Sequence, residues 1–493
     1  MRQDLVRFGP ELALSATVAL VLFADLLLKG SGRRRFVLHG LAVLGVIGAG
    51  FALLLLPSGD RSIFSGMLAV DGMARFFKGL FLVVALFGIL FGALSDEIPE
   101  DRFGEYLLLL LCLTLGLSIL SAAQNLLLIY LALELVSLPS YILAGFRRGD
   151  KRSSEAALKY VIYGGAASGV MLYGFSLLYG LGGTLDLAGV GQYVESLASQ
   201  GWGSQLAVVA ACLFSLAGFA YKVAAVPFHM WCPDVYEGAP TPFVAFLSVG
   251  PKAAGLAALV RFFLVGYGAP TFWMTPGEFP WPLVLGVLAI ATMTLGNLVA
   301  IAQENIKRML AYSSIAHAGY MLMGVAVGTS EGVRAVMLYL GIYLAMNLGA
   351  FLAVMAVRAR IGSESISDYK GLGTRSPYLA ALLAIFLFSL VGLPPLGGFI
   401  GKFYVFAAVL HVKYKFFYFL ALVGVLNSAV SLYYYARVIK TMFLEKPDGE
   451  AASFTLAPSY GALLTVLMIP TVALGIWWKP LADAVAKMSL VVR

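Results

Sequence analysis

The chain has 493 residues, of which 60% are hydrophobic and only 12% are charged. A soluble fold of this length carries about twice that share of charge. The composition therefore excludes a soluble globular enzyme and a disordered protein. The net charge of +8 does not indicate nucleic-acid binding, because Lys and Arg are scattered at the ends of apolar segments, where membrane-orientation signals are found.

Apolar runs of about twenty residues recur along the chain and predict an all-α polytopic membrane protein with about fourteen transmembrane helices. The first run lacks an A-x-A cleavage site, so we expect a first span and no removed signal peptide. Short connections leave no room for a soluble domain; the longest, at 57–71, 181–204, 265–280, 358–377 and 443–454, could hold irregular structure or a surface helix. The predicted spans are 10–29, 36–56, 72–95, 104–122, 124–146, 155–180, 205–229, 239–264, 281–301, 309–328, 331–357, 378–410, 414–442 and 455–477.

Basic residues favour the connections that follow odd-numbered spans, for example Arg33–Arg35, Arg147–Arg148 and Lys307–Arg308. Cytoplasmic loops carry the excess of Lys and Arg in membrane proteins. We therefore expect these loops in the cytoplasm, both termini in the periplasm, and the chain in a bacterial inner membrane.

Two predicted spans are interrupted by proline. The seventh contains Pro227 and Pro233, and the twelfth contains Pro394 and Pro395 followed by two glycines. The breaks lie five spans apart, which is typical of two inverted five-helix repeats in a transporter. We expect N-terminal helices 1–3 at 1–103, a first repeat (helices 4–8) at 104–264, a second repeat (helices 9–13) at 281–443, and a C-terminal helix 14 at 455–493.

Four charged residues fall inside predicted spans: Glu134, Lys222, Lys252 and Lys402. A charge at the bilayer centre costs about 2.5–3.5 kcal/mol on insertion scales. A file of lysines whose proton affinity depends on a neighbouring charge is the minimal element of a proton relay. The competing interpretations are a Glu134–Lys222 ion pair that only locks helices together, and a lysine at position 252 or 402 that extends to the interface.

Two histidines are further relay candidates. His317 lies in span ten and is placed to link Lys252 with Lys402. His229 lies in the break of span seven, where it could carry protons or cap freed carbonyls. A buried histidine is also often only a structural residue, so both roles stay open at this point.

Other polar residues near the span ends favour structural roles. We expect Lys159 and Arg261 to extend to the interface, and Asp234 and Glu237 to cap the helix that restarts after the break. The tyrosine run 433–435 is typical of a membrane-interface belt.

The energy for proton transfer must come from outside the chain. Moving one charge against 100 mV requires about 2.3 kcal/mol. No nucleotide-binding pattern is present, since GLGTRS at 371–376 fails the dinucleotide fingerprint. The three cysteines have neither metal nor redox spacing. A partner complex or an opposing ion gradient must therefore drive the relay.

Three segments carry a resemblance to a known family. PFHMWCPDVYEGAPTPFVAFLSVGPKAAG (227–255), NLVAIAQENIKRMLAYSSIAHAGY (297–320) and GLPPLGGFIGKFYVF (392–406) resemble the antiporter-like N subunits of proton-pumping NADH:quinone oxidoreductase, respiratory complex I. The family fold has fourteen helices with two inverted five-helix units. Lysine at position 402, where M-type relatives usually carry glutamate, and the absence of the long C-terminal extension of L-type relatives both favour the N type.

The resemblance implies roles for particular residues. Glu134 matches the family's span-five glutamate, Lys222 its span-seven lysine and Lys252 its connecting lysine, while His317 and Lys402 match its connecting histidine and terminal lysine. It further implies that this chain holds no cofactor, and that quinone, FMN and iron–sulfur clusters belong to other subunits. The implied partners are K-type and M-type membrane neighbours and a peripheral redox arm.

Two other functions compete with this one. A subunit of a multisubunit Na+/H+ antiporter shares the core and would work without a redox partner. A purely structural scaffold is disfavoured by the intramembrane charges. The PDVYEGAPTP stretch favours the redox-driven complex.

Overall fold

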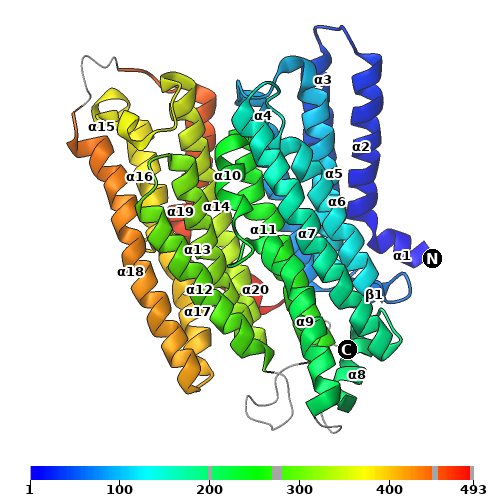
Figure 1. Ribbon diagram of the computed structural model, residues 1–493. Helices are drawn as coiled ribbons and strands as arrows, with labels where there is room; N and C mark the ends of the chain where they lie inside the picture. The colour runs from blue at the N-terminus through cyan, green and yellow to red at the C-terminus, as the bar shows by residue number, and fades with distance from the viewer. Residues whose placement is uncertain (1, 198–201, 269–279, 447–452, 489–493) are drawn as a thin grey trace.

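The computed structural model describes residues 2–197, 202–268, 280–446 and 453–488, and these form a bundle of long helices (Figure 1). Among these residues, twelve helical segments are long and apolar enough to cross a membrane, and α13 and the pair α16–α17 complete the fourteen predicted spans. The spans are α2 (Gly9–Leu27), α3 (Arg34–Leu54), α4 (Gly72–Leu94), α5 (Phe103–Ala122), α6 (Leu126–Ala144), α7 (Lys151–Gly182), α9 (Trp202–Val223) with α10 (Trp231–Gly238), α11 (Thr241–Gly266), α12 (Trp281–Ile301), α13 (Ile306–Ala326), α14 (Ser330–Ile361), α16 (Pro377–Val391) with α17 (Gly397–His411), α18 (Lys415–Leu444) and α19 (Pro458–Ile476).

Short elements occupy the ends and the connections. The connection predicted at 57–71 folds into an antiparallel hairpin, β1 (Arg61–Ile63) with β2 (Leu68–Val70), which the sequence analysis did not predict. The predicted connections 181–204, 265–280 and 443–454 lie partly outside the described residues. The remaining elements are α1 (Arg2–Arg7), η1 (Glu100–Arg102), α8 (Leu187–Leu197), η2 (Ile366–Tyr369), α15 (Leu372–Arg375) and α20 (Lys479–Ala486).

The two five-helix units share a local geometry that identifies them as repeats. Asn125 caps the start of α6, and Asn305 caps the start of α13. Each side chain accepts hydrogen bonds from the backbone N–H groups two and three residues further along the chain. Each asparagine also forms a β-bridge to the segment after the long third helix of its own unit, at Asp186 and Ser365. Because matching helices of the two units lie five spans apart, an odd number, the two asparagine caps lie at opposite ends of the bundle and the repeats are inverted.

The two breaks occupy the fourth helix of each unit, as predicted. The first separates α9 from α10, and the second separates α16 from α17. At the first break, the freed N–H of Val226 donates to Thr292 Oγ1 of α12 at 3.0 Å. Irregular backbone at membrane depth requires this kind of internal partner, because lipid offers none.

Three helices form the interior of the bundle. Every residue of α11 is buried, as is nearly every residue of α13 and most of α14. Figure 1 shows α2 and α3 at one edge of the molecule and α18 at the other, so these three helices lie between the outer ones. Most side chains on α11, α13 and α14 are therefore shielded from lipid by protein.

Arg261, near the end of α11, was predicted to extend to the membrane interface, and this prediction is wrong. Its side chain is fully buried and donates to both carboxylate oxygens of Asp71 at 2.7 and 2.9 Å, and to the Ser121 carbonyl at 2.7 Å. Sequence position near a span end could not reveal that Asp71, the N-cap of α4, lies opposite.

A second buried ion pair joins α2 to α4. Lys78 Nζ lies 2.7 Å from Glu11 Oε1, and both side chains are almost completely buried. Removing one member of such a pair leaves an uncompensated buried charge, whereas removing both charges can be nearly neutral.

We expect Lys78→Met to lower the free energy of unfolding by about 3–5 kcal/mol. The double variant Glu11→Gln/Lys78→Met should recover most of that loss, and Arg61→Gln, at an exposed hairpin position, serves as the control. Thermal unfolding of the purified protein in detergent checks this. Equal stability of the single and double variants would contradict the assignment.

Candidate functional site

The first buried lysine lies next to the break of the first repeat. Lys222 occupies the last turn of α9, and its Nζ donates to Ser137 Oγ of α6 at 2.9 Å. A Cβ atom added to Gly255 of α11 would stand 3.3 Å from the Lys222 side chain, so α9 and α11 are in close contact here. Lys222 therefore points inward between α6 and α11.

Glu134 lies on α6 one turn before Ser137 and is half-buried. Its Oε1 has no hydrogen-bond partner among the described residues, and no ion pair joins Glu134 to Lys222 in this part of the chain. The Lys222 ammonium binds a serine hydroxyl in place of the carboxylate. This geometry does not support an ion pair that only locks the two helices together.

The second lysine is in the centre of the bundle. Lys252 Nζ donates to Ser314 Oγ of α13 at 2.6 Å and lies 5.9 Å from the ring centre of Tyr236. Ser314 also accepts a hydrogen bond from the Tyr343 hydroxyl of α14 at 3.0 Å. Because α11 is buried along its whole length, Lys252 does not extend to the interface.

His317 lies one turn after Ser314 on α13 and continues the polar chain. Its Nδ1 is 2.6 Å from the Tyr339 hydroxyl and its Nε2 is 3.5 Å from the Tyr435 hydroxyl. The imidazole also packs on the ring of Tyr343, with ring centres 5.1 Å apart. The histidine therefore contacts helices α14 and α18 at once.

The third lysine lies at the break of the second repeat. Lys402 Nζ donates to the Val391 carbonyl at 2.8 Å and to Ser428 Oγ at 2.9 Å. That carbonyl is at the end of α16, where the break leaves it without a helical partner. Gly392 follows with φ +90°, and a Cβ there would meet the Lys402 side chain at 3.0 Å. Glycine thus allows both the turn and the approach of the lysine.

The polar groups on α11, α13 and α17 lie next to one another in a row that we call the polar file, whereas no hydrogen bond or ion pair among the described residues joins Lys222 to it. Lys252 and Tyr343 both donate to Ser314, and the Tyr343 ring packs against His317. His317 stacks edge-on against Tyr320, whose ring centre is 4.6 Å from Lys402 Nζ. The side chains are buried, with exposed fractions of 1% for Lys222, 3% for Lys252, 2% for His317 and 4% for Lys402.

The repeat symmetry relates the partners of the lysines. Glu134 and Ser314 each lie nine residues after the capping asparagine of their helix, and Ser137 and His317 each lie twelve residues after it. Lys222 binds Ser137, which belongs to the same repeat as Lys222. Lys252 also belongs to the first repeat, but it binds Ser314 of the second repeat. The file therefore crosses from one repeat into the other at Ser314.

The remaining candidate, His229, lies between α9 and α10. Its side chain is buried, but its Nδ1 has no hydrogen-bond partner among the described residues. The neighbouring Pro227 and Met230 are exposed on the outside of the bundle. The structure therefore does not bring His229 into the polar file.

Sequence reasoning missed the hydroxyl-bearing residues that contact the buried lysines and His317: Ser137, Ser314, Tyr339, Tyr343 and Tyr435. Of the tyrosine run 433–435, only Tyr433 is exposed, as a belt residue should be, while Tyr434 and Tyr435 are buried. Helical spacing from His317 could have indicated Ser313 and Ser314, because they lie one turn away on the same helix.

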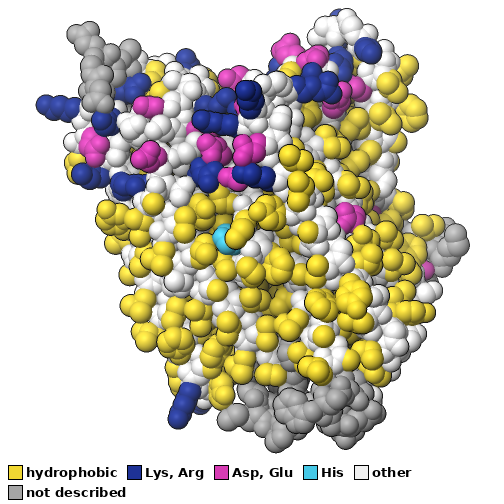
Figure 2. Space-filling model, in the orientation of Figure 1, with side chains coloured by type: hydrophobic (Ala, Val, Ile, Leu, Met, Phe, Trp, Pro, Cys, Tyr) yellow, Lys and Arg dark blue, Asp and Glu magenta, His cyan; other side chains and the backbone are white. Residues whose placement is uncertain are grey.

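Charged groups hold the connection between α10 and α11 at one end of the bundle, where charged side chains gather in Figure 2. Glu97 is buried and accepts hydrogen bonds from the Thr241 backbone N–H at 2.9 Å and from Arg147 at 3.2 Å, while Arg358 lies 3.6 Å away. One carboxylate therefore joins the N-terminal helices to both repeats.

Cationic side chains of the second repeat bind α10 and the residue that follows it. Lys307 Nζ donates to the Ala239 carbonyl at 2.9 Å, and Arg308 Nη1 donates to Asp234 at 2.6 Å and to Glu237 at 2.8 Å. Asp234 and Glu237 were expected to cap the restarted helix, but neither α10 nor α11 has a side-chain cap. Both carboxylates tie α10 to the start of α13, which carries Ser314 and His317.

Comparison with known proteins agrees with this geometry. Residues 123–429 match the family described as "NADH:quinone oxidoreductase/Mrp antiporter, TM". A protein of Anaeromyxobacter sp. named NADH-quinone oxidoreductase subunit N is 48% identical over 96% of this chain and 94% of its own length. A Sorangium cellulosum protein named NADH-quinone oxidoreductase subunit N 2 is 47% identical over 99% and 98%.

This chain belongs to the subunit N branch of that antiporter-like family. A chain in the structure titled "Respiratory complex I from Thermus thermophilus with bound Aureothin" shares 32% identity and a TM-score of 0.76, covering 95% of this chain and 99% of the other. A chain of the Mrp complex from Dietzia sp. has a TM-score of 0.81 at 21% identity, over 98% and 96%, which shows a common fold alone. The antiporter-like fold predicted from the sequence is confirmed.

Glu97 should make the stability of the protein depend on pH. Burial alone would raise the pKa of Glu97, but the charges of Lys307 and Arg358 and the hydrogen bond from Thr241 outweigh it, so the pKa lies below its ordinary value. A depressed carboxylate pKa adds stability above the unfolded value of about 4.3, and this contribution is lost as the pH falls through the folded value.

We expect Glu97→Gln to lower the free energy of unfolding at pH 7 by roughly 1–3 kcal/mol. The difference from wild type should shrink as the pH falls below about 4. Melting temperatures measured across pH check this, with Glu100→Gln as the control because Glu100 is 82% exposed. A pH-independent difference would contradict the assignment.

Proposed function

We propose that this chain is a proton-translocating subunit in the membrane arm of an NADH:quinone oxidoreductase, moving protons through Glu134, Lys222, Lys252, His317 and Lys402. The observation that carries the proposal is the set of buried ammonium and imidazole groups in both repeats, each of which contacts a serine or tyrosine hydroxyl. Intramembrane ionisable groups that face a protein interior are typical of proton pathways. The names of relatives that match nearly the full length add support.

The chemistry follows from the contacts of each lysine. A hydroxyl can donate and accept at once, so Ser314 can pass a proton between Lys252 and Tyr343 by rotating its O–H group. Tyr435 and Tyr339 can serve the two nitrogens of His317 in the same way. A negative charge on Glu134 favours the protonated form of Lys222, and neutralising that charge favours release of the proton from Lys222.

We also propose the setting in which the chain works. It acts as a non-redox subunit of the translocase, holds no NADH, flavin or iron–sulfur site, and relies on quinone reduction in other subunits. Its neighbours are K-type and M-type membrane subunits and a peripheral redox arm. It lies in the bacterial inner membrane with both termini in the periplasm, which places the charged end of Figure 2 in the cytoplasm.

A Na+/H+ antiporter subunit is the second candidate function. The fold shared with the Dietzia Mrp chain favours it as an alternative, because the same scaffold there belongs to an Mrp complex. NADH-driven proton uptake without Na+ dependence would support the redox-driven function. Na+ exchange driven by a pH gradient in the absence of peripheral redox subunits would support the alternative.

The central test replaces the buried lysines in the assembled complex. Lys222→Met and Lys402→Met should each lower NADH-driven proton uptake into inverted membrane vesicles at least about tenfold, because a relay loses its acid–base group. Lys415→Gln, at an exposed position of α18, should leave it unchanged. Full pumping by both assembled methionine variants would overturn the proposal and favour a scaffold.

A finer test concerns the crossing point between repeats. Ser314→Ala removes the hydroxyl shared by Lys252 and Tyr343, and should lower proton uptake about two- to tenfold while the complex still assembles. Ser168→Ala is the matched control, because that buried hydroxyl binds only its own helix backbone on α7. Threonine at position 314 should restore pumping, and equal loss in both alanine variants would contradict a relay role.

A further inference from the structure

Lys402 has fewer oxygen partners than its ammonium group can bind. An ammonium has three N–H donors. Two of them are used, by the Val391 carbonyl at 2.8 Å and by Ser428 Oγ at 2.9 Å. Among the described residues no third oxygen atom accepts from Lys402, and only 4% of the residue is exposed. The charge therefore needs a further source of stabilisation.

No carboxylate in the surrounding helices supplies it. The helix that carries Lys402, α17, packs mainly against α13, α14, α16, α18 and α19. These six helices contain one acidic residue, Glu331, which is exposed in the first turn of α14. The titratable side chains that face Lys402 are His317 and Tyr320 of α13, while Tyr339 of α14 touches α17.

The ring of Tyr320 takes the open position next to the ammonium. Lys402 Nζ lies over the ring, 4.6 Å from its centre. The face of an aromatic ring is negative and attracts a cation within about 6 Å, most strongly where water is excluded. Both residues are buried, and Tyr320 is only 1% exposed. Because the attraction acts on the ammonium and not on the neutral amine, the ring favours the protonated form of Lys402.

The hydroxyl of Tyr320 binds a different partner, Asn297 of α12. Asn297 is fully buried, and its Nδ2 donates to the hydroxyl at 3.2 Å. The same amide binds two groups of α18, since Nδ2 lies 3.3 Å from Asn427 Oδ1 and Oδ1 accepts from the Tyr434 hydroxyl at 3.0 Å. In the described part of the chain no hydrogen bond joins the Tyr320 hydroxyl to Lys402. The hydroxyl thus anchors the ring.

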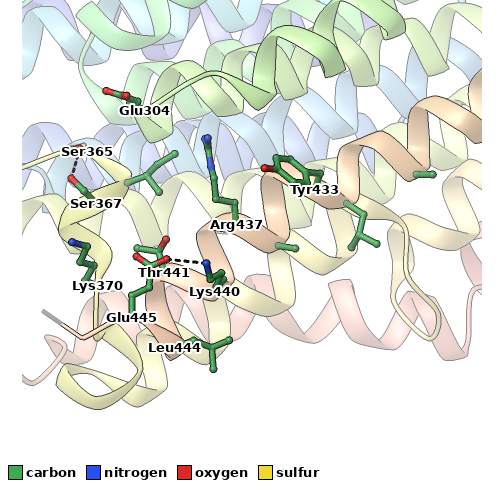
Figure 3. Close-up of a pocket in the computed structure, with 14 residues that line it drawn as sticks. Glu304, Ser365, Ser367, Lys370, Tyr433, Arg437, Lys440, Thr441, Leu444 and Glu445 are labelled. Atoms are coloured by element: carbon green, nitrogen blue, oxygen red, sulfur yellow. Dashed lines mark hydrogen bonds and ion pairs between the residues drawn. The ribbon is translucent and has the colours of Figure 1, made fainter.

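The contact between α12 and α18 that carries this anchor is also held one turn beyond Asn297. There Arg437 of α18 donates to the Ile301 carbonyl at 2.8 Å and to the Gln303 carbonyl. Figure 3 shows Arg437 on α18, where it lines a surface pocket between α18 and the segment that carries η2. Packing outside the polar file therefore fixes Asn297, and Asn297 fixes the orientation of the Tyr320 ring.

We propose that Tyr320 holds the charged form of Lys402 through its ring face, and that Asn297 is a positioning residue that acts through the Tyr320 hydroxyl. Tyr320 takes the place of a carboxylate counter-ion and does not itself carry the proton. A buried carboxylate would fix the charge on the lysine, whereas a ring attracts the ammonium less strongly and still allows release. The inference rests on the proposed pumping function and adds the group that sets how firmly Lys402 retains its proton.

The test measures the protons taken up per NADH oxidised by inverted vesicles of the assembled complex, as a function of pH. Tyr320→Leu removes the ring, so Lys402 should lose its proton more readily. The pH at which uptake falls by half on the alkaline side should move down by about one pH unit. Tyr320→Phe keeps the ring face and loses only the anchor, so this pH should move by less than about half as much.

The matched control is Tyr106→Leu. Tyr106 is also a fully buried tyrosine, but its hydroxyl binds the Gly88 carbonyl at 2.9 Å, outside the polar file. Its alkaline midpoint should stay at the wild-type pH. An equal shift in Tyr106→Leu and Tyr320→Leu would overturn the proposal, because loss of packing alone would then explain it.

A fluorinated ring covers the case in which Tyr320→Leu does not assemble. Trifluorophenylalanine at position 320 keeps the shape of phenylalanine but withdraws the negative charge from the ring face. The alkaline midpoint should lie about one pH unit below that of Tyr320→Phe. Equal midpoints for the two rings would overturn the proposal.

Asn297 is tested in combination with the ring. Asn297→Leu should move the alkaline midpoint as far as Tyr320→Phe does, because both variants remove the same hydrogen bond. The double variant Asn297→Leu/Tyr320→Phe should show no further shift. Additive shifts would overturn the positioning role of Asn297.

Lys402→Met separates this inference from the proposed function. If Lys402→Met pumps as wild type, the proposed function fails and the inference fails with it. If Lys402→Met stops pumping while Tyr320→Leu keeps the wild-type midpoint, only the role of the ring is overturned. Equal loss of pumping in Tyr320→Phe and Tyr320→Leu, without a shift in midpoint, would show that the hydroxyl carries the proton and would also overturn it.

Discussion

The desolvation of three ammonium groups is the constraint on which the interior of this protein depends. Each lysine exchanges its hydration shell for oxygen atoms of the protein, and in each case a serine hydroxyl on a neighbouring helix takes part: Ser137 for Lys222, Ser314 for Lys252 and Ser428 for Lys402. A carboxylate at the same distance would fix the charge in place. A hydroxyl satisfies the ammonium and still allows it to lose a proton, so the contacts suit groups that change charge.

The broken helices supply free backbone groups that can bind buried side chains. The Val391 carbonyl reaches Lys402 because the helix ends there, and Gly392 lets the lysine approach the backbone. At the first break, Thr292 of the other repeat satisfies the Val226 N–H. Each break is therefore stabilised by polar partners from elsewhere in the bundle, which ties the position of the break to the packing of both repeats.

The repeats share a scaffold and differ in chemistry. Matching asparagine caps place Glu134 and Ser314 at the same position of α6 and α13. The first repeat has a half-buried carboxylate at that position, and the second has a fully buried hydroxyl inside the file. The charged residues Glu97 and Arg308 bind the α10–α11 region of the first repeat, and Arg308 lies on α13, the helix of the second repeat that carries His317.

The membrane class, the fourteen spans, the two breaks and the intramembrane charges could all be predicted from the sequence, because length, hydropathy and proline act locally along the chain. The family resemblance added the expected roles of those charges. The partners of the polar groups followed only from how the helices pack: Arg261 binds Asp71, Lys222 binds Ser137 in place of Glu134, and Tyr435 contacts His317. Serine and tyrosine give little signal in an apolar sequence, since their function depends on which helix lies opposite, and packing over long sequence distances sets that.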